Sequence, residues 1–79
     1  MVVALRTWLD ANPLRRWRTA EQVSLMATCG LAGVSMSAVQ KWEAGAARPT
    51  PENMITLARI TGRKGIADDW TRWLNQERN

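Results

Sequence analysis

The sequence contains no histidine, tyrosine or phenylalanine and has a single cysteine, Cys29. Without histidine the commonest general base is missing, and no nucleophile stands beside an obvious base elsewhere in the chain. One cysteine can form neither an intramolecular disulfide nor a thiolate metal site within one chain. We therefore expect a protein that is not an enzyme, holds no metal and no cofactor, and resides in the reducing cytoplasm.

Long apolar runs are also missing, because no stretch approaches the roughly 20 apolar residues of a membrane span. The N-terminus lacks the charged and apolar regions of a secretion signal. We therefore expect no membrane association. The 79 residues suit a single domain, and 11 Lys and Arg against 7 Asp and Glu give a net charge of +4. Such a basic chain, with a pI near 10.7, is attracted to polyanions.

Turn and capping residues divide the chain into five or six short helical segments, and no alternating pattern predicts a strand. The fold class is therefore all-α. Asn12-Pro13 and Thr50-Pro51 each combine an N-cap residue with a proline at the first helical position. The expected helices lie at about residues 2–11, 13–22, 25–32, 35–45, 51–62 and 66–76.

The short helix that begins at Ser35 has a distinct outer side. Ser35 predicts its N-cap and Gly45 its left-handed end. Val39 and Trp42, three residues apart, are expected to face the core. The outer strip then consists of Met36, Ser37, Gln40 and Lys41.

Five tryptophans could indicate base stacking on single strands. Four of them, Trp17, Trp42, Trp70 and Trp73, lie on apolar helical faces, which favours the core. The last helix has an apolar stripe that is richer than a chain of this size needs for its own core. We therefore predict a subunit interface there, formed by Trp70, Trp73 and Leu74. The N-terminal helix is expected either to cover the apolar helix at residues 25–32 or to join this interface.

A spaced set of residues carries a family resemblance. Val34-Ser35, then Trp42-Glu43-Ala44-Gly45, then Pro49 and Leu57-Ala58 resemble the phage repressor and Cro family of helix-turn-helix proteins, called XRE-type. The register extends back without a gap to Leu14-Arg15, and the resemblance covers about residues 14–62. It implies a lambda-repressor-like DNA-binding domain at residues 13–62, with an extra N-terminal helix at 1–12 and a C-terminal helix at 63–79.

Sequence-specific binding of double-stranded DNA is the function that this resemblance implies. We predict that Met36, Ser37, Gln40 and Lys41 read bases in the major groove. Phosphate contacts are expected from Ser24, Ser35, Arg15, Arg16 and Arg48. Arg18 and Glu43 stand at the positions of the family's structural ion pair. Leu25 departs from the family, which often has a DNA-contacting glutamine there, so we expect that contact to be lost.

Three functions remain open on the sequence. The leading hypothesis is a nucleoid-associated transcriptional repressor of phage or prophage type, which binds a pseudo-palindromic operator as a homodimer. An alternative is an antitoxin-like or other protein-interaction module on the same fold, with or without repression of its own promoter. A third is non-specific nucleic-acid binding by charge.

Overall fold

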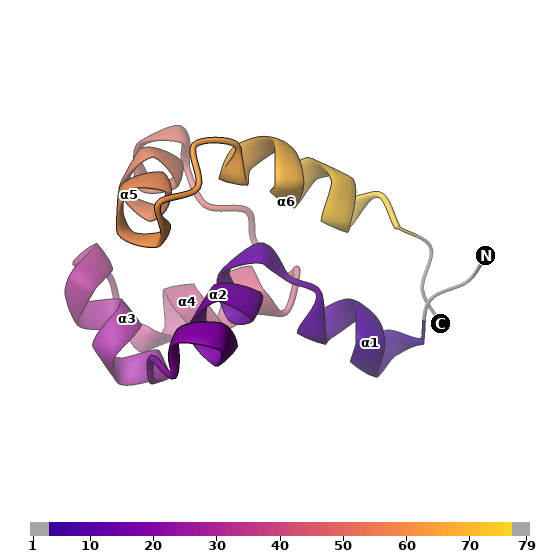
Figure 1. Cartoon of the computed structure of the whole chain (residues 1–79), viewed down its shortest axis with the longest axis horizontal. Helices are drawn as coiled ribbons and strands as arrows, with labels where there is room; N and C mark the ends of the chain where they lie inside the picture. Colours follow the sequence, from indigo (N-terminus) through magenta and orange to yellow (C-terminus); the bar gives the residue numbers. More distant parts are fainter. Residues whose placement is uncertain (1–3, 77–79) are drawn as a thin grey trace.

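The computed structural model describes residues 4–76, and within that range it has six α-helices and no strand (Figure 1). The all-α prediction is confirmed. The helix expected from residue 2 begins at Leu5, and residues 2 and 3 lie outside the described range. The helices are α1 (Leu5–Asp10), α2 (Pro13–Glu21), α3 (Leu25–Ala32), α4 (Met36–Glu43), α5 (Pro51–Thr61) and α6 (Ile66–Leu74).

Local capping explains why four of these helices begin where the sequence predicts. In each, the side-chain oxygen of the N-cap residue accepts a hydrogen bond from the backbone N–H three residues later, which satisfies one of the unpaired donors of the first turn. α2 ends less predictably, on Gln22 in the left-handed conformation with φ of 56°. The N-cap residues are Asn12 for α2, Ser24 for α3, Ser35 for α4 and Thr50 for α5.

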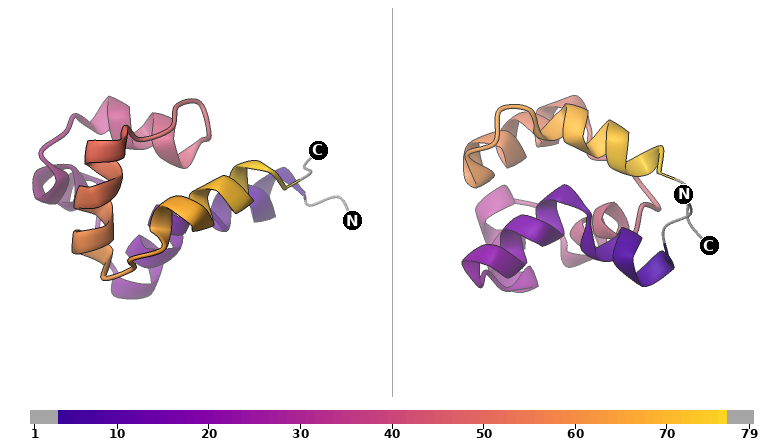
Figure 2. Two further views of the ribbon diagram at one scale, coloured as in Figure 1. Left: turned by 90° about the horizontal axis from the view of Figure 1, so that it is seen from above. Right: turned by 45° about the vertical axis from the view of Figure 1, so that its right-hand side comes forward.

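α1 and α6 lie side by side at one end of the molecule, and α3 and α5 lie at the other (Figures 1 and 2). α3 packs against both α4 and α5, while α6 packs against α2 and α5. The resulting body measures 35 × 21 × 21 Å. None of the helices within residues 4–76 has the length and hydropathy of a membrane span.

A tryptophan pair joins the first helix to the last. The rings of Trp8 and Trp73 stack with centroids 4.1 Å apart and an interplanar angle of 8°. Trp8 Nε1–H donates to the Trp73 carbonyl at 2.7 Å, and Trp73 Nε1–H donates to the Trp8 carbonyl at 2.5 Å. Trp70 adds an edge-to-face contact to Trp73 at 5.8 Å. Each stacked indole thus buries its apolar ring and satisfies its polar N–H at once.

These contacts correct the predicted subunit interface. Trp70 and Trp73 are 0% and 2% exposed, so they belong to the core of their own chain. Leu74 is half-buried and packs against the same core. The N-terminal helix does join these tryptophans, as one alternative held, but it does so within the chain, and it leaves the outer side of α3 uncovered. The apolar stripe of α6 packs against Trp8 of the same chain.

Candidate nucleic-acid interface

A turn of three residues, 33–35, connects α3 to α4. Gly33 has a φ of 68°, a left-handed conformation that costs glycine little because it has no Cβ. The N–H groups of Gly33 and Val34 both donate to the carbonyl of Cys29, at 2.9 and 3.2 Å. These bonds close the end of α3 and let the chain enter α4 in a new direction. The arrangement is a helix-turn-helix.

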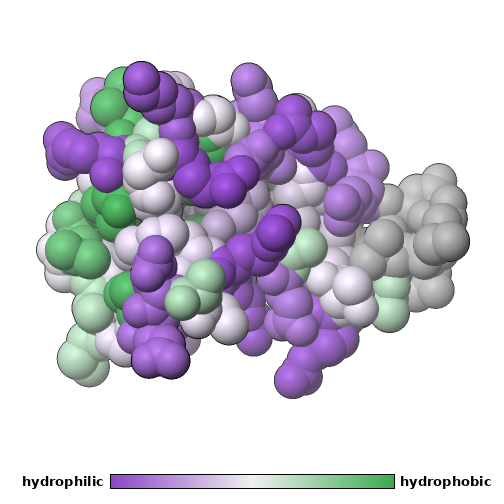
Figure 3. Space-filling view, in the orientation of Figure 1, coloured by the Kyte–Doolittle hydropathy of each residue, from purple (hydrophilic) through white to green (hydrophobic). Residues whose placement is uncertain are grey.

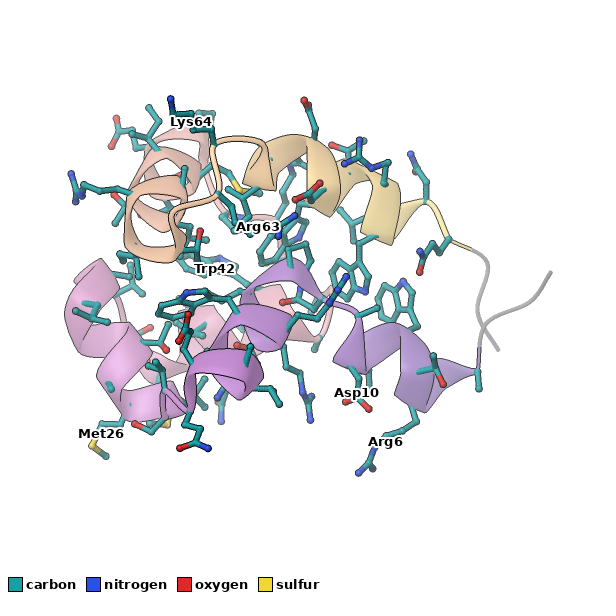
Figure 4. All side chains as sticks on the ribbon, in the orientation of Figure 1. Arg6, Asp10, Met26, Trp42, Arg63 and Lys64 are labelled. Atoms are coloured by element: carbon teal, nitrogen blue, oxygen red, sulfur yellow. The ribbon has the colours of Figure 1, made fainter. Side chains whose placement is uncertain are left out.

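The inner side of α4 is held firmly in the core. Val39 is 0% exposed and Trp42 is 5% exposed, and the ring of Trp42 points into the interior (Figure 4). Asn12 is also buried: its Oδ1 caps α2, and its Nδ2 donates to the Trp42 carbonyl at 3.4 Å. The sequence predicted Asn12 only as a cap. Its link to α4 joins residues 30 apart in the chain, which no local pattern could indicate.

The ion pair expected between Arg18 and Glu43 is present and bidentate. Arg18 Nε donates to Glu43 Oε2 at 2.6 Å and Arg18 Nη2 to Oε1 at 2.7 Å, while Nη1 donates to the Val23 carbonyl at 3.3 Å. The side chain of Glu43 is 7% exposed, so its charge needs this partner. The hydrogen bonds to Glu43 raise the pKa of Arg18. The pair fixes α4 against α2.

On its outer side α4 presents the four residues predicted to read bases, which we call the reading strip: Met36, Ser37, Gln40 and Lys41. All four are exposed, and Met36 keeps 38% of its surface accessible. Among residues 4–76, the side chains of Ser37, Gln40 and Lys41 have no hydrogen-bond or ion-pair partner. Their donors and acceptors are therefore available to a ligand, while the backbone that carries them is anchored from behind.

The two serines predicted to contact phosphates lie at the starts of α3 and α4. Ser24 Oγ accepts from Ala27 N–H at 3.0 Å and Ser35 Oγ accepts from Ala38 N–H at 3.1 Å, and both serines are exposed. At each helix the first two amides have no acceptor within the described part of the chain. Free amides at the positive end of a helix dipole suit an anionic phosphate. Leu25, by contrast, packs against the core.

The three arginines predicted to contact phosphates are not gathered at one place. Arg15 Nε lies 3.6 Å from Asp10 Oδ1, which offsets its charge. Arg16 lines a groove between α2 and α6 together with Trp17. Arg48 is exposed, but its Nη2 donates to the Ala67 carbonyl of α6 at 3.1 Å. Arg48 thus also ties the loop after α4 to the last helix, a role that the sequence did not indicate.

The extra N-terminal helix supports the end of α4. Gly45, just after α4, has a φ of 76°, and a Cβ added there would lie 2.5 Å from Cη2 of Trp8. The Trp8 ring therefore occupies the space that a side chain at residue 45 would fill. The sequence indicated the left-handed conformation of Gly45 but not this contact, because the contact depends on the distant tryptophan pair.

Neither the interface nor the rest of residues 4–76 contains a group of three or more cysteine, aspartate or glutamate side chains placed to hold a metal ion. A family model described as a helix-turn-helix domain matches residues 11–69. The chain belongs to the helix-turn-helix domain family. The match spans α2 to the first half of α6 and includes the whole α3–turn–α4 unit, so the family assignment and the geometry agree on a DNA-binding domain. α1 lies outside the matched region. Neither the curated proteins nor the solved structures provide a match to the chain.

Proposed function

We propose that this helix-turn-helix protein is a transcriptional repressor of phage or prophage type that binds a pseudo-palindromic operator as a homodimer. α4 enters the major groove of each half-site and reads bases there with the reading strip. The observation that carries this proposal is the contrast between the two sides of α4. Val39, Trp42 and Glu43 are fixed in the interior, whereas Ser37, Gln40 and Lys41 are exposed without a partner in residues 4–76.

The reading strip has the chemistry that base recognition requires. Gln40 can pair bidentately with adenine, Lys41 can donate to guanine O6 and N7, and Ser37 can hydrogen-bond to either. Met36 offers an apolar contact for a thymine methyl group. Good contacts of this kind discriminate against a wrong base by about 1–3 kcal/mol each. The exposed amides at the starts of α3 and α4, with Ser24 and Ser35, would position the strip on phosphates.

The small size of the reading helix favours a homodimer. α4 has 8 residues, little more than two turns, so it can reach only a few base pairs. Two copies on half-sites about 34 Å apart would double the sequence that is read, as dimeric helix-turn-helix proteins do. Arg15, Arg16 and Arg48 would then add phosphate contacts that do not depend on sequence.

A second function is favoured by a specific observation on α3. Met26 and Leu31 are 72% and 58% exposed, and Ala27 and Gly30 are exposed beside them. The outer face of α3 therefore carries no charged residue, and Figure 4 shows Met26 pointing away from the molecule. On the surface drawn in Figure 3, hydrophobic residues gather at the end formed by α3 and α5. Such a surface suits a protein-interaction module, as in an antitoxin that also represses its own promoter.

The test is selection of bound sequences from a pool of random DNA duplexes at physiological salt. The repressor proposal predicts an enriched palindrome with half-sites about one helical turn apart. Retained binding without enrichment would leave only charge-driven binding, which falls steeply as salt rises. Absence of binding would overturn the repressor proposal and favour the interaction module.

A further inference from the structure

The exposed face of α5 carries an apolar residue between two opposite charges. Ile55 is 69% exposed, and Glu52 and Arg59 are exposed as well. Spacings of three and four residues place these three side chains along one side of the helix. Neither Glu52 nor Arg59 has an ion-pair partner in residues 4–76. We call this acid–apolar–base row the α5 stripe.

An apolar groove opens directly beside the stripe. Ile55 lines it together with Pro51 and Ala58 of α5, and Ile66 and Ala67 contribute from the start of α6. Apart from Arg48 and Lys64, every residue that lines the groove is apolar. The same face of the molecule therefore has both a protruding apolar side chain, Ile55, and an apolar groove that can receive such a side chain.

We infer that a second copy of the chain docks on this face, with the two α5 stripes packed antiparallel across a two-fold axis near Ile55. A two-fold contact forms every pairing twice. If residue i of one copy contacts residue j of its partner, then residue j of the first copy contacts residue i of the partner. The midpoint between Glu52 and Arg59 falls beside Ile55. An antiparallel crossing there brings Glu52 of each copy opposite Arg59 of the other and lets each Ile55 enter the other copy's groove.

The order of the charges along the α5 stripe indicates that a second copy of the chain docks on it. The α5 stripe is its own complement when reversed, so a second copy supplies an acid opposite each base and a base opposite each acid. Glu52 and Arg59 are too far apart for a direct pair within one helix, since seven residues span about 10 Å. Lys64, which follows α5 and lines the groove, adds positive charge at the end of the helix that the partner's Glu52 approaches.

This inference rests on the proposed homodimer and names its surface. No residue of the reading strip lines the groove, so docking through α5 leaves α4 free for DNA. The tryptophans of α6 stay in the core. The apolar face of α3 also remains open, and a dimer through α3 is therefore an alternative that the experiment must separate.

The experiment is a charge swap followed by sedimentation equilibrium over micromolar to millimolar protein. Glu52→Arg and Arg59→Glu each place like charges opposite one another twice in the dimer, and each should raise the dimer dissociation constant about tenfold. The double variant Glu52→Arg/Arg59→Glu restores opposite charges and should recover most of the wild-type affinity. Ile55→Gln, at an exposed position, should weaken the dimer without disturbing the fold.

Glu21→Arg is the matched control, because Glu21 is an exposed acid on α2 and its reversal changes the net charge equally. Circular dichroism checks that each variant is folded. Equal weakening by Glu21→Arg, or no recovery in the double variant, would overturn the α5 surface. A wild-type chain that is monomeric both free and on selected DNA would overturn it too.

Failure of the α5 surface and failure of the repressor proposal give different results. If the charge swaps leave the dimer dissociation constant unchanged but the protein binds an enriched palindrome, only the α5 surface is contradicted. A dimer that responds to the swaps as described but enriches no DNA sequence supports the surface and contradicts the repressor proposal.

Discussion

At the end of the molecule formed by α1 and α6, the large side chains pack into the core. Around α3 and α4, by contrast, much of the helical surface is exposed. Trp8 and Trp73 stack and exchange hydrogen bonds, and both are at most 2% exposed. Gln40 and Lys41, on the outer side of α4, have no partner within residues 4–76. The α1–α6 end stabilises the fold, and the α3–α4 region is anchored to it.

Glu43 and Gly45 connect the two regions. Glu43 ties the inner side of α4 to α2 through Arg18, and Gly45 receives the ring of Trp8 at the end of α4. Substitutions in or near the core should therefore change stability first. Substitutions in the reading strip should change DNA binding while leaving stability almost untouched.

Arg18→Ala should have the largest effect on folding. It leaves the buried Glu43 carboxylate without its partner, and breaking such a pair costs about 3–5 kcal/mol. The free energy of unfolding from urea titration measures the loss. The double variant Arg18→Met/Glu43→Leu removes both charges and should recover most of the stability. If it is as unstable as Arg18→Ala, the unpaired charge is not the cause.

Gly45→Ala should follow, with a loss of roughly 2–5 kcal/mol. A left-handed conformation costs a residue with a Cβ about 1–2 kcal/mol, and overpacking against the Trp8 ring adds about 1–3 kcal/mol. Gly62→Ala is the control, because Gly62 has a similar φ of 70° but no atom within 4 Å of an added Cβ. Equal losses in the two variants would show that contact with Trp8 does not constrain Gly45.

Trp73→Phe should cost about 1–2 kcal/mol more than Trp70→Phe. Both changes remove the same ring atoms, but only Trp73 Nε1–H donates to a carbonyl, and its loss leaves the Trp8 carbonyl without that bond. Trp70 Nε1 is buried with no partner among residues 4–76, so phenylalanine relieves an unsatisfied donor. Thermal and urea unfolding of the two variants make the comparison. A larger loss for Trp70→Phe would contradict it.

Asp69→Asn should have the smallest effect on stability, and this effect should depend on pH. A hydrogen bond from Arg63 first, and then the charges of Arg63 and Arg72, hold the pKa of Asp69 below the ordinary value of 3.8. The resulting stabilisation is fully present above about pH 3.8 and is lost as the pH falls through the lower, folded-state pKa. Asp69→Asn should therefore lower the Tm slightly at neutral pH and progressively less in acid.

Asp68→Asn is the matched control for this change. Asp68 is also acidic and lies in the first turn of α6, but it has no ion pair within residues 4–76. It therefore reports the helix-dipole contribution alone. If both variants lower the Tm equally at every pH, the arginine pairs contribute nothing to stability.

Local signals explain how much of this structure could be predicted. The starts of α2 to α5 depend on a capping side chain and the next few residues, so Asn12, Ser24, Ser35 and Thr50 were readable from the sequence. The outer side of α4 followed from its helical period. The Trp8–Trp73 pair spans 65 positions, and the apolar stripe of α6 could not show whether its partner was this chain or a second copy. Arg48 was equally ambiguous, since an exposed arginine can reach many acceptors.

The most direct test of the central claim combines a variant with a changed base pair. Binding of wild type and Lys41→Ala is titrated by fluorescence anisotropy on the selected operator and on operators altered at one position at a time. The account predicts that Lys41→Ala costs about 1–3 kcal/mol on the operator and loses discrimination at one base pair per half-site, while Arg16→Ala weakens all duplexes alike. Equal losses by both variants on operator and random DNA would contradict recognition by α4.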